Sequence, residues 1–216
     1  MMSGFFVTGT DTGVGKTFVT SAIARRAREL GRRVFAFKPI ETGCVLVEGR
    51  LVGEDQEALC RAAGNWQTDE LRGVYRFARP VAPLVAAEEQ QTTIDIERID
   101  EALRKGIGGA ELVLVEGAGG WRVPITSSLD MGGLARRIGL PVVLVARASL
   151  GTINHTLLSA EAVERDGCSL RAVVLSKHPG EDSAFVESNA DQIRRRWSGQ
   201  VIVATGRGRE LDVLCS

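Results

Sequence analysis

The sequence predicts an α/β fold in one domain spanning residues 1–216, with a mostly parallel central sheet of about seven strands and helices on both faces. Two observations lead to this prediction. Short apolar, β-prone runs alternate with longer segments of helical apolar spacing along the chain. A glycine-rich turn, residues 9–15, joins the first such run to the first helical segment. Right-handed crossovers would bring the carboxyl ends of all the strands to one edge of the sheet.

The strands are predicted from runs rich in Val, Leu, Ile and Phe. These runs occupy residues 5–7, 34–37, 112–116, 141–146, 170–176 and 201–204. Several contain almost no polar residue, which is typical of parallel strands that are buried on both faces. Pro39 cannot donate to a ladder, so the second strand is expected to end before it.

The helices are predicted from apolar residues spaced three and four positions apart. They are expected at residues 18–30, 54–63, 94–105, 129–138, 151–163 and 183–197. Three glycines, Gly31, Gly64 and Gly139, follow helical segments as stop signals. Residues 43–53 lack a clear period and are expected to form a mobile loop or lid. Residues 75–85 are expected to be irregular and rigid because of two prolines, and the polar tail, residues 205–216, is assigned no element.

Composition argues against several classes of protein. Hydrophobic residues make up 44% of the chain, and 27 basic residues balance 27 acidic ones, which argues against nucleic acid, an anionic membrane surface or disorder. No basic segment precedes an apolar run at the N-terminus, and no apolar run is long enough to span a bilayer, so neither a signal peptide nor a membrane partner is expected. The four cysteines are scattered, which fits reduced thiols in the cytoplasm.

The turn after the first strand has the features of a phosphate-binding loop, or P-loop. Residues 9–17 read GTDTGVGKT, and backbone N–H groups at the start of the following helix favour an anion. Lys16 can then reach the β- and γ-phosphates of a nucleoside triphosphate, and the Thr17 hydroxyl can ligate Mg²⁺. The strict pattern requires glycine where this chain has Thr10, so the alternative is a glycine-rich turn with an incidental surface lysine. The flanking strand and helix favour nucleotide binding.

Further polar residues follow the carboxyl ends of other strands. Lys38 is either a ligand-binding lysine or a solvated strand-end lysine, and its position alone does not decide between them. Asp55 lies in a first helical turn, where a role as partner of the helix dipole is the simpler interpretation. Glu116 ends a buried strand, and because burying an unpaired carboxylate is costly, a role in orienting Mg²⁺ is favoured. The helix start at residues 149–154 offers amides for a second anion.

Together these motifs resemble the dethiobiotin synthetase family of P-loop NTPases. The matching stretches are FVTGTDTGVGKT (6–17), FKPIETG (37–43), the helix start at Asp55, RFARPVAP (76–83), LVEGAGGWRVP (114–124) and LGTINHT (150–156). The resemblance implies an ATP- and Mg²⁺-dependent ligase of biotin biosynthesis. Such an enzyme carboxylates 7,8-diaminononanoate with CO2 or bicarbonate, activates the carbamate as an anhydride with phosphate, and closes it to the cyclic urea dethiobiotin, releasing ADP and phosphate.

The resemblance also implies roles for individual residues. The catalytic residues would be Lys16, Lys38 and Thr12. Nucleotide would be bound by Gly13, Val14, Gly15, Lys16, Thr17, Glu116 and Ser176. The substrate would be bound by Thr42, Gly151, Thr152 and Asn154. Mg²⁺ would be held by Thr17, Asp55 and Glu116, which replaces the capping interpretation of Asp55. A homodimer is implied as well, in which the Asn154 position reaches into the partner's site.

Three positions depart from the family pattern. Ser176 stands where many members carry an asparagine that reads adenine, and a hydroxyl cannot offer the paired donor and acceptor of an amide. Residues 201–209 contain no clear counterpart of the base-binding loop, and Leu84 stands where many members have histidine. The nucleotide base preference is therefore left open.

The sequence suggests three other interpretations, and it argues against the first two of them. An amidotransferase-type synthetase related to cobyrinate synthases usually carries an additional glutaminase domain, for which this chain is too short. A nucleotide-dependent dimer switch of the ParA/MinD kind carries a signature lysine where this chain has Asp11. A degenerate paralogue that binds nucleotide without turnover is the third interpretation.

Overall fold

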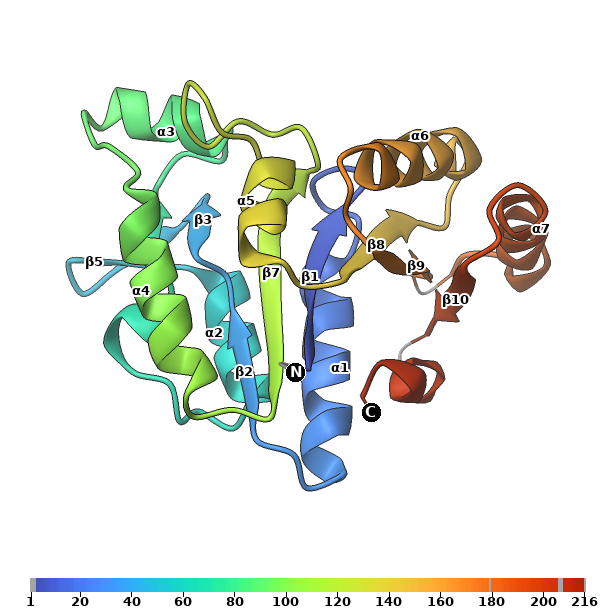
Figure 1. Cartoon of the computed structure of the whole chain (residues 1–216), viewed down its shortest axis with the longest axis horizontal. Helices are drawn as coiled ribbons and strands as arrows, with labels where there is room; N and C mark the ends of the chain where they lie inside the picture. Colours follow the sequence, from blue (N-terminus) through green and yellow to red (C-terminus); the bar gives the residue numbers. More distant parts are fainter. Residues whose placement is uncertain (1–2, 179, 206–207, 216) are drawn as a thin grey trace.

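The computed structural model describes residues 3–178, 180–205 and 208–215. Its centre is a six-stranded sheet in the order β10-β9-β8-β1-β7-β2, in which every neighbouring pair is parallel (Figure 1). The strands are β1 (Gly4–Gly9), β2 (Val34–Phe37), β7 (Leu112–Gly120), β8 (Val142–Arg147), β9 (Leu170–Ser176) and β10 (Gln200–Ala204). The predicted α/β fold with a parallel sheet is confirmed, with six strands in the sheet instead of about seven.

Helices cover both faces of this sheet, as predicted. They are α1 (Lys16–Glu29), α2 (Glu54–Ala62), α3 (Pro83–Glu89), α4 (Ile96–Ile107), α5 (Met131–Ile138), α6 (Thr152–Arg165) and α7 (Ser183–Arg194). One core lies between the sheet and α1 and α2. On the opposite face, one core lies under α4 and α5, and another under α6 and α7. Strand residues that alternate between these cores, such as Val113 and Leu114, show why the β runs are apolar throughout.

Two small sheets lie beside the main one. Strand β3 (Ile40–Thr42) pairs in parallel with β6 (Tyr75–Phe77), and β4 (Val45–Val47) pairs antiparallel with β5 (Arg50–Val52). The expected mobile loop at residues 43–53 is therefore largely a hairpin. The expected irregular segment at 75–85 contains β6 and the start of α3, because a proline such as Pro83 is well tolerated in the first turn of a helix.

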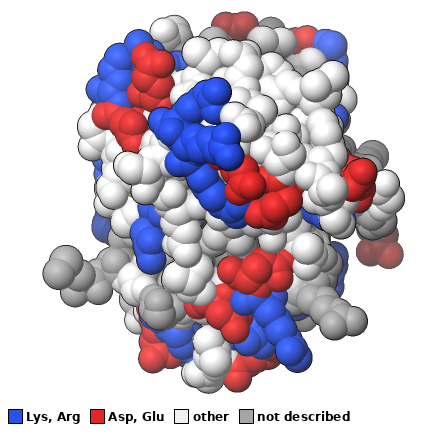
Figure 2. Space-filling model, turned by 90° about the vertical axis from the view of Figure 1, so that its right-hand side faces the viewer, with Lys and Arg blue, Asp and Glu red and all other residues white. Residues whose placement is uncertain are grey.

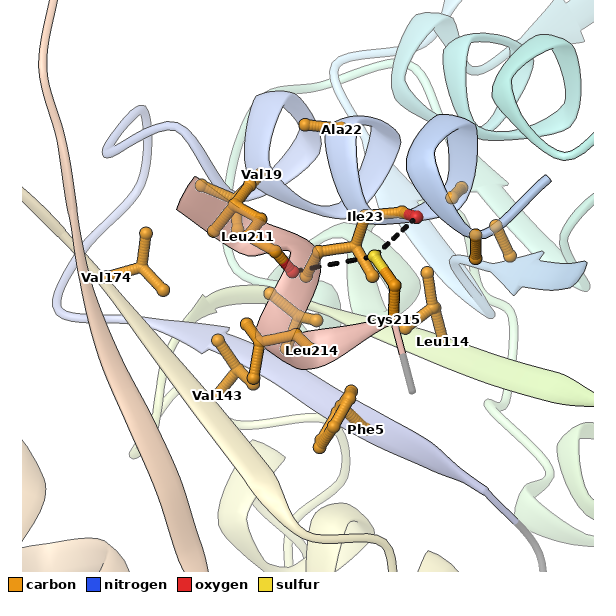
Figure 3. Packing of buried hydrophobic residues seen from close by; sticks show 14 of the residues in the cluster. Phe5, Val19, Ala22, Ile23, Leu114, Val143, Val174, Leu211, Leu214 and Cys215 are labelled. Atoms are coloured by element: carbon orange, nitrogen blue, oxygen red, sulfur yellow. Dashed lines mark hydrogen bonds between the residues drawn. The ribbon is translucent and has the colours of Figure 1, made fainter. Parts of the chain in front are cut away.

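The C-terminal tail is the largest difference from the sequence-based expectation. It forms a 3-10 helix, η2 (Arg209–Leu214), whose side chains Leu211 and Leu214 are fully buried against α1 together with Cys215 (Figure 3). Asp212 accepts two hydrogen bonds from Arg26 of α1, at 2.6 and 2.7 Å. The tail is polar on average, but Leu211 and Leu214 lie three positions apart, one turn of a 3-10 helix, and so share one side of η2. Part of the tail, residues 206–207 and 216, lies outside the described residues.

The charged surface agrees with the equal numbers of basic and acidic residues in the sequence. Figure 2 shows one face on which basic and acidic side chains lie next to one another in mixed groups, and uncharged surface separates these groups. Within the described ranges, no helix combines the length and the apolar character needed to cross a membrane. All four cysteines carry free thiols, and three of them are buried.

Candidate active site

The glycine-rich loop lies between β1 and α1, as its sequence context predicted. Gly13 and Gly15 have φ values of 70° and 98°, which favour glycine. A Cβ atom built on Gly15 would lie 2.3 Å from the Oγ atom of Ser176, so the close packing of β9 also excludes a side chain there. The loop therefore leads its backbone directly into the N-terminus of α1, where the helix dipole favours an anion.

A cavity of about 500 Å³ opens in front of this loop. Most of the predicted site residues line it: Thr12, Gly13, Gly15, Lys16, Thr17, Lys38, Thr42 and Asp55. The remaining lining residues come from α1, the proline stretch, β7 with the loop that follows it, and the end of β9: Phe18, Pro80, Val81, Ala82, Pro83, Ala118, Gly119, Val123 and His178. Segments that are far apart in the sequence thus meet at the carboxyl edge of the sheet, the usual ligand site of an open α/β sheet.

Lys16 lies within the loop, and its side chain is almost fully buried. Its Nζ atom donates to the backbone oxygen of Asp11 at 2.8 Å. Burial, together with the positive charge of the neighbouring Lys38, lowers the pKa of Lys16 to about 8. An anion in the loop would compensate both effects, so the loop is prepared for a phosphate group.

Lys38 forms a charge cluster with the two predicted metal-binding carboxylates. Its Nζ atom lies 2.5 Å from Oδ2 of Asp55 and 2.9 Å from Oε1 of Glu116. Burial alone would lower the pKa of Lys38, but attraction to Glu116 and Asp55 outweighs it and raises the pKa. Lys38 is therefore a buried site residue, and the alternative of a solvated strand-end lysine is wrong.

Asp55 likewise belongs to the site and does not cap α2. Burial would raise the pKa of Asp55, yet the neighbouring Lys38 lowers it below its ordinary value. The backbone N–H groups at the start of α2 are bound by a different carboxylate: Asp55 N and Gln56 N donate to the two oxygens of Glu41 at 2.9 and 3.0 Å. The capping interpretation of Asp55 is therefore wrong, and Glu41 fills that role.

The oxygen atoms of this cluster suit a magnesium ion. The Thr17 hydroxyl donates to Oε1 of Glu116 at 2.7 Å, while Oε2 of the same buried carboxylate has no hydrogen-bond partner among the described residues. No group of three or more His, Cys, Asp or Glu suited to a metal occurs in the described part of the chain. Mg²⁺ commonly uses only one or two carboxylates and takes its other ligands from phosphates and water, so Thr17, Asp55 and Glu116 fit it.

Other predicted residues lie outside the cavity lining. Val14, within the loop, and Ser176, at the end of β9, are both buried. At the start of α6, Gly151 has a φ of 92°, and the buried Thr152 hydroxyl lies 3.4 Å from that of Thr156. Asn154 is exposed on the same turn. Within one chain, the structure does not bring the α6 start into the cavity.

Some residues of the site had no clear signal in the sequence. Glu41 lies inside the FKPIETG motif, but nothing local indicates that its carboxylate turns toward α2. His178 follows β9 and lines the cavity without belonging to any motif. The proline stretch, residues 80–83, belongs to a matching stretch and is expected to be rigid, but its sequence does not show that it forms one wall of the cavity. These positions depend on how separate segments pack, which spacing alone does not reveal.

The fold and the loop define the class of the protein. A parallel sheet whose first strand leads through a glycine-rich turn into a helix, with a buried lysine in that turn, is the architecture of P-loop nucleotide-binding proteins. Solved structures agree at the level of fold. The MinC:MinD cell division protein complex of Aquifex aeolicus matches with a TM-score of 0.53 at 15% identity, covering 99% of this chain and 84% of that one.

A second similar structure is the signal recognition particle receptor FtsY of Elizabethkingia anophelis, with a TM-score of 0.52 at 14% identity. The match covers 100% of this chain and 66% of FtsY. At these identities the likeness concerns the fold alone.

Sequence relatives define the family. The AAA domain model AAA_26 matches residues 3–205. An ATP-dependent dethiobiotin synthetase BioD of Anaeromyxobacter dehalogenans (strain 2CP-C) is 43% identical over 194 residues, covering 90% of this chain and 85% of the relative. The BioD protein of Anaeromyxobacter sp. (strain Fw109-5) is 40% identical over the same shares. The chain belongs to the family of ATP-dependent dethiobiotin synthetases, which are ligases, and the resemblance of its motifs is confirmed.

Proposed function

We propose that this protein carries out the ATP-dependent synthesis of dethiobiotin from 7,8-diaminononanoate and CO2 in biotin biosynthesis. Family membership supports the overall reaction. The observation that supports the detailed chemistry is the presence of two buried lysines in one cavity. Lys16 lies in the phosphate-binding loop, and Lys38 enters from β2 between two carboxylates. Simple nucleotide binding requires only the first lysine, whereas a second anion beside the γ-phosphate would require another cation.

The reaction we propose has three steps. An amine of the substrate attacks CO2, forming an N–C bond and losing a proton, which gives a carbamate. A carbamate oxygen attacks the γ-phosphorus of ATP, and the bond from that phosphorus to the oxygen of ADP breaks. The second amine then attacks the carbonyl carbon of this mixed anhydride. Phosphate leaves, a proton is lost, and the cyclic urea is closed.

The chain's own residues would act mainly by positioning and by charge, as phosphoryl transfer requires. Lys16 would stabilise the charge on the transferred phosphoryl group. Lys38 would hold the carbamate oxygens beside that group, because it lines the same cavity as Lys16. The hydroxyls of Thr12 and Thr42, which line the same cavity, would donate hydrogen bonds to the carbamate or phosphate oxygens.

Two further parts of the proposal concern binding partners. Thr17, Asp55 and Glu116 would hold Mg²⁺, which when bound neutralises charge on the β- and γ-phosphates. Gly151, Thr152 and Asn154 would bind the distal carboxylate of the substrate, with the Asn154 position reaching into the site of a second copy of the chain. Their place outside the cavity of their own chain is compatible with this homodimer. The free thiols fit a cytoplasmic protein.

The test is phosphate release by purified protein with Mg²⁺, bicarbonate and 7,8-diaminononanoate, with dethiobiotin measured by mass spectrometry. ATP, CTP and GTP are compared in parallel, because the base preference is open. Release should depend on the diamine, and Lys38→Arg should lose most of it. Lys105→Arg, at an exposed lysine of α4, is the matched control. Phosphate release that ignores the diamine would instead indicate a nucleotide switch. Tight nucleotide binding without release would indicate a degenerate paralogue.

A further inference from the structure

Glu41 is a buried carboxylate beside the site to which the proposed reaction assigns no role. It lies in the middle of β3, three residues after Lys38 and one before Thr42, and only 5% of the residue is exposed. Its Oε1 atom accepts the backbone N–H of Asp55 at 2.9 Å, and its Oε2 atom accepts that of Gln56 at 3.0 Å. Both oxygens are thus used on the first turn of α2, and we name this pair of contacts the Glu41 clamp.

The local sequence is adapted to this clamp. The residue before α2 is Gly53, and it provides no side-chain cap of its own. A Cβ atom on Gly53 would lie 2.2 Å from Oε2 of Glu41, so only glycine leaves room for the carboxylate. A carboxylate that accepts two N–H groups at a helix N-terminus also interacts favourably with the helix dipole. The geometry therefore holds the first turn of α2 at a fixed place relative to β3.

This fixed place determines where the side chains of the first turn lie. Asp55, whose own N–H is clamped, points its carboxylate to Lys38 at 2.5 Å. Gln56, the other clamped residue, accepts the backbone N–H of Lys38 at 2.5 Å and donates to the oxygen of Ala36 at 3.2 Å. Both clamped residues thus contact Lys38, one through its side chain and one through its backbone. Displacement of the clamp would move the two groups together.

We infer that Glu41 is a positioning residue that sets the Mg²⁺ affinity of the nucleotide complex by holding Asp55 in place. The inference rests on the proposed role of Asp55 in holding the ion. Glu41 does not itself reach the ion, because both of its oxygens are occupied by amides. Groups that orient a metal ligand typically change metal affinity or activity by about 10- to 100-fold when they are replaced.

The test is calorimetric titration of ATP into Glu41→Gln, with EDTA and with increasing Mg²⁺. Glutamine keeps the shape of the side chain, but its NH2 group faces one of the two N–H donors, so one contact of the clamp is lost. The Mg²⁺ concentration that half-saturates ATP binding should rise about 10-fold or more. ATP affinity in EDTA should stay within about twofold of the wild type, since the phosphate-binding loop is unchanged.

Two comparisons separate positioning from a general structural role. Asp95→Asn alters an exposed carboxylate that caps α4, and the Mg²⁺ requirement should not change. In an Asp55→Asn background, Glu41→Gln should add little, because Glu41 acts on the ion through Asp55 and the two effects are not additive. A full additional loss in that background would show that Glu41 acts by another route.

Several results would overturn the inference. An unchanged Mg²⁺ requirement in folded Glu41→Gln would do so, as would an equal loss of ATP affinity with and without Mg²⁺. If Glu41→Gln does not fold, Glu41→Asp keeps the charge but withdraws it from α2, and the same rise is expected. Because the readout is binding, the clamp can be tested even if diamine-dependent phosphate release is absent. The failure of one proposal is thus distinguishable from the failure of the other.

Discussion

Replacing Lys38 with methionine should destabilise the nucleotide-free protein strongly. Methionine fills the volume of the lysine stem, so the change removes the ammonium group and leaves almost no cavity. It leaves Glu116, which is fully buried, without the cation 2.9 Å away. Removing one partner of a buried ion pair typically costs about 3–5 kcal/mol, because the other charge remains without compensation. The half-exposed Asp55 can be hydrated and should add little to this cost.

The measurement is equilibrium unfolding in urea without nucleotide or Mg²⁺. With an m-value of about 2 kcal/mol/M, a loss of 3–5 kcal/mol lowers the midpoint by roughly 1.5–2.5 M. The control is Lys105→Met, whose ammonium lies 3.9 Å from Glu70 at the surface. That exposed substitution should change the free energy of unfolding by less than about 0.5 kcal/mol.

A second substitution identifies the cause of the loss. Glu116→Gln in the Lys38→Met background removes the uncompensated charge, so the double variant should regain at least half of the lost stability. It should still lack diamine-dependent turnover, because the second lysine of the site is absent. A Lys38→Met protein within about 1 kcal/mol of the wild type would refute the reasoning, since an uncompensated buried charge must cost more than that.

Three further predictions concern the loop and the tail. Because the pKa of Lys16 is lowered to about 8 and phosphate binds its protonated form, ATP affinity measured by calorimetry should fall about tenfold per pH unit above pH 8, and Lys16→Arg should remove this dependence. Ser176→Asn should weaken the binding of ATP, CTP and GTP alike, because a larger side chain would press on Gly15; a selective gain for ATP would contradict this. In urea unfolding, Leu214→Ala should lower the free energy of unfolding by about 2–5 kcal/mol, whereas Val213→Ala, at its half-exposed neighbour, should lower it by under about 1 kcal/mol. A loss for Leu214→Ala as small as that for Val213→Ala would show that the buried tail contributes no core packing.

Local patterns in the sequence were sufficient for most of the fold. The runs at 34–37 and 170–176 are β2 and β9 with the predicted bounds. The glycines and the lysine of the loop correctly predicted the strand–turn–helix unit at residues 4–29. These features depend on neighbours along the chain, where side-chain periodicity and turn chemistry act directly. The tail was missed because it is polar on average, although Leu211, Leu214 and Cys215 are spaced to face one side.

By itself, the sequence determined the class of fold, the phosphate-binding loop and the family to which the chain belongs. Only the tertiary structure decided which groups Lys38, Asp55 and Glu41 contact. Lys38 and Glu116 are 78 positions apart and meet because β2 lies next to β7 in the sheet. The β4–β5 hairpin separates Glu41 from α2 along the chain, but the fold brings the Glu41 carboxylate to the first turn of α2. The capping role therefore belongs to Glu41 and not to Asp55. Charge pairing and burial depend on which segments become neighbours in space, and no local pattern encodes that distance.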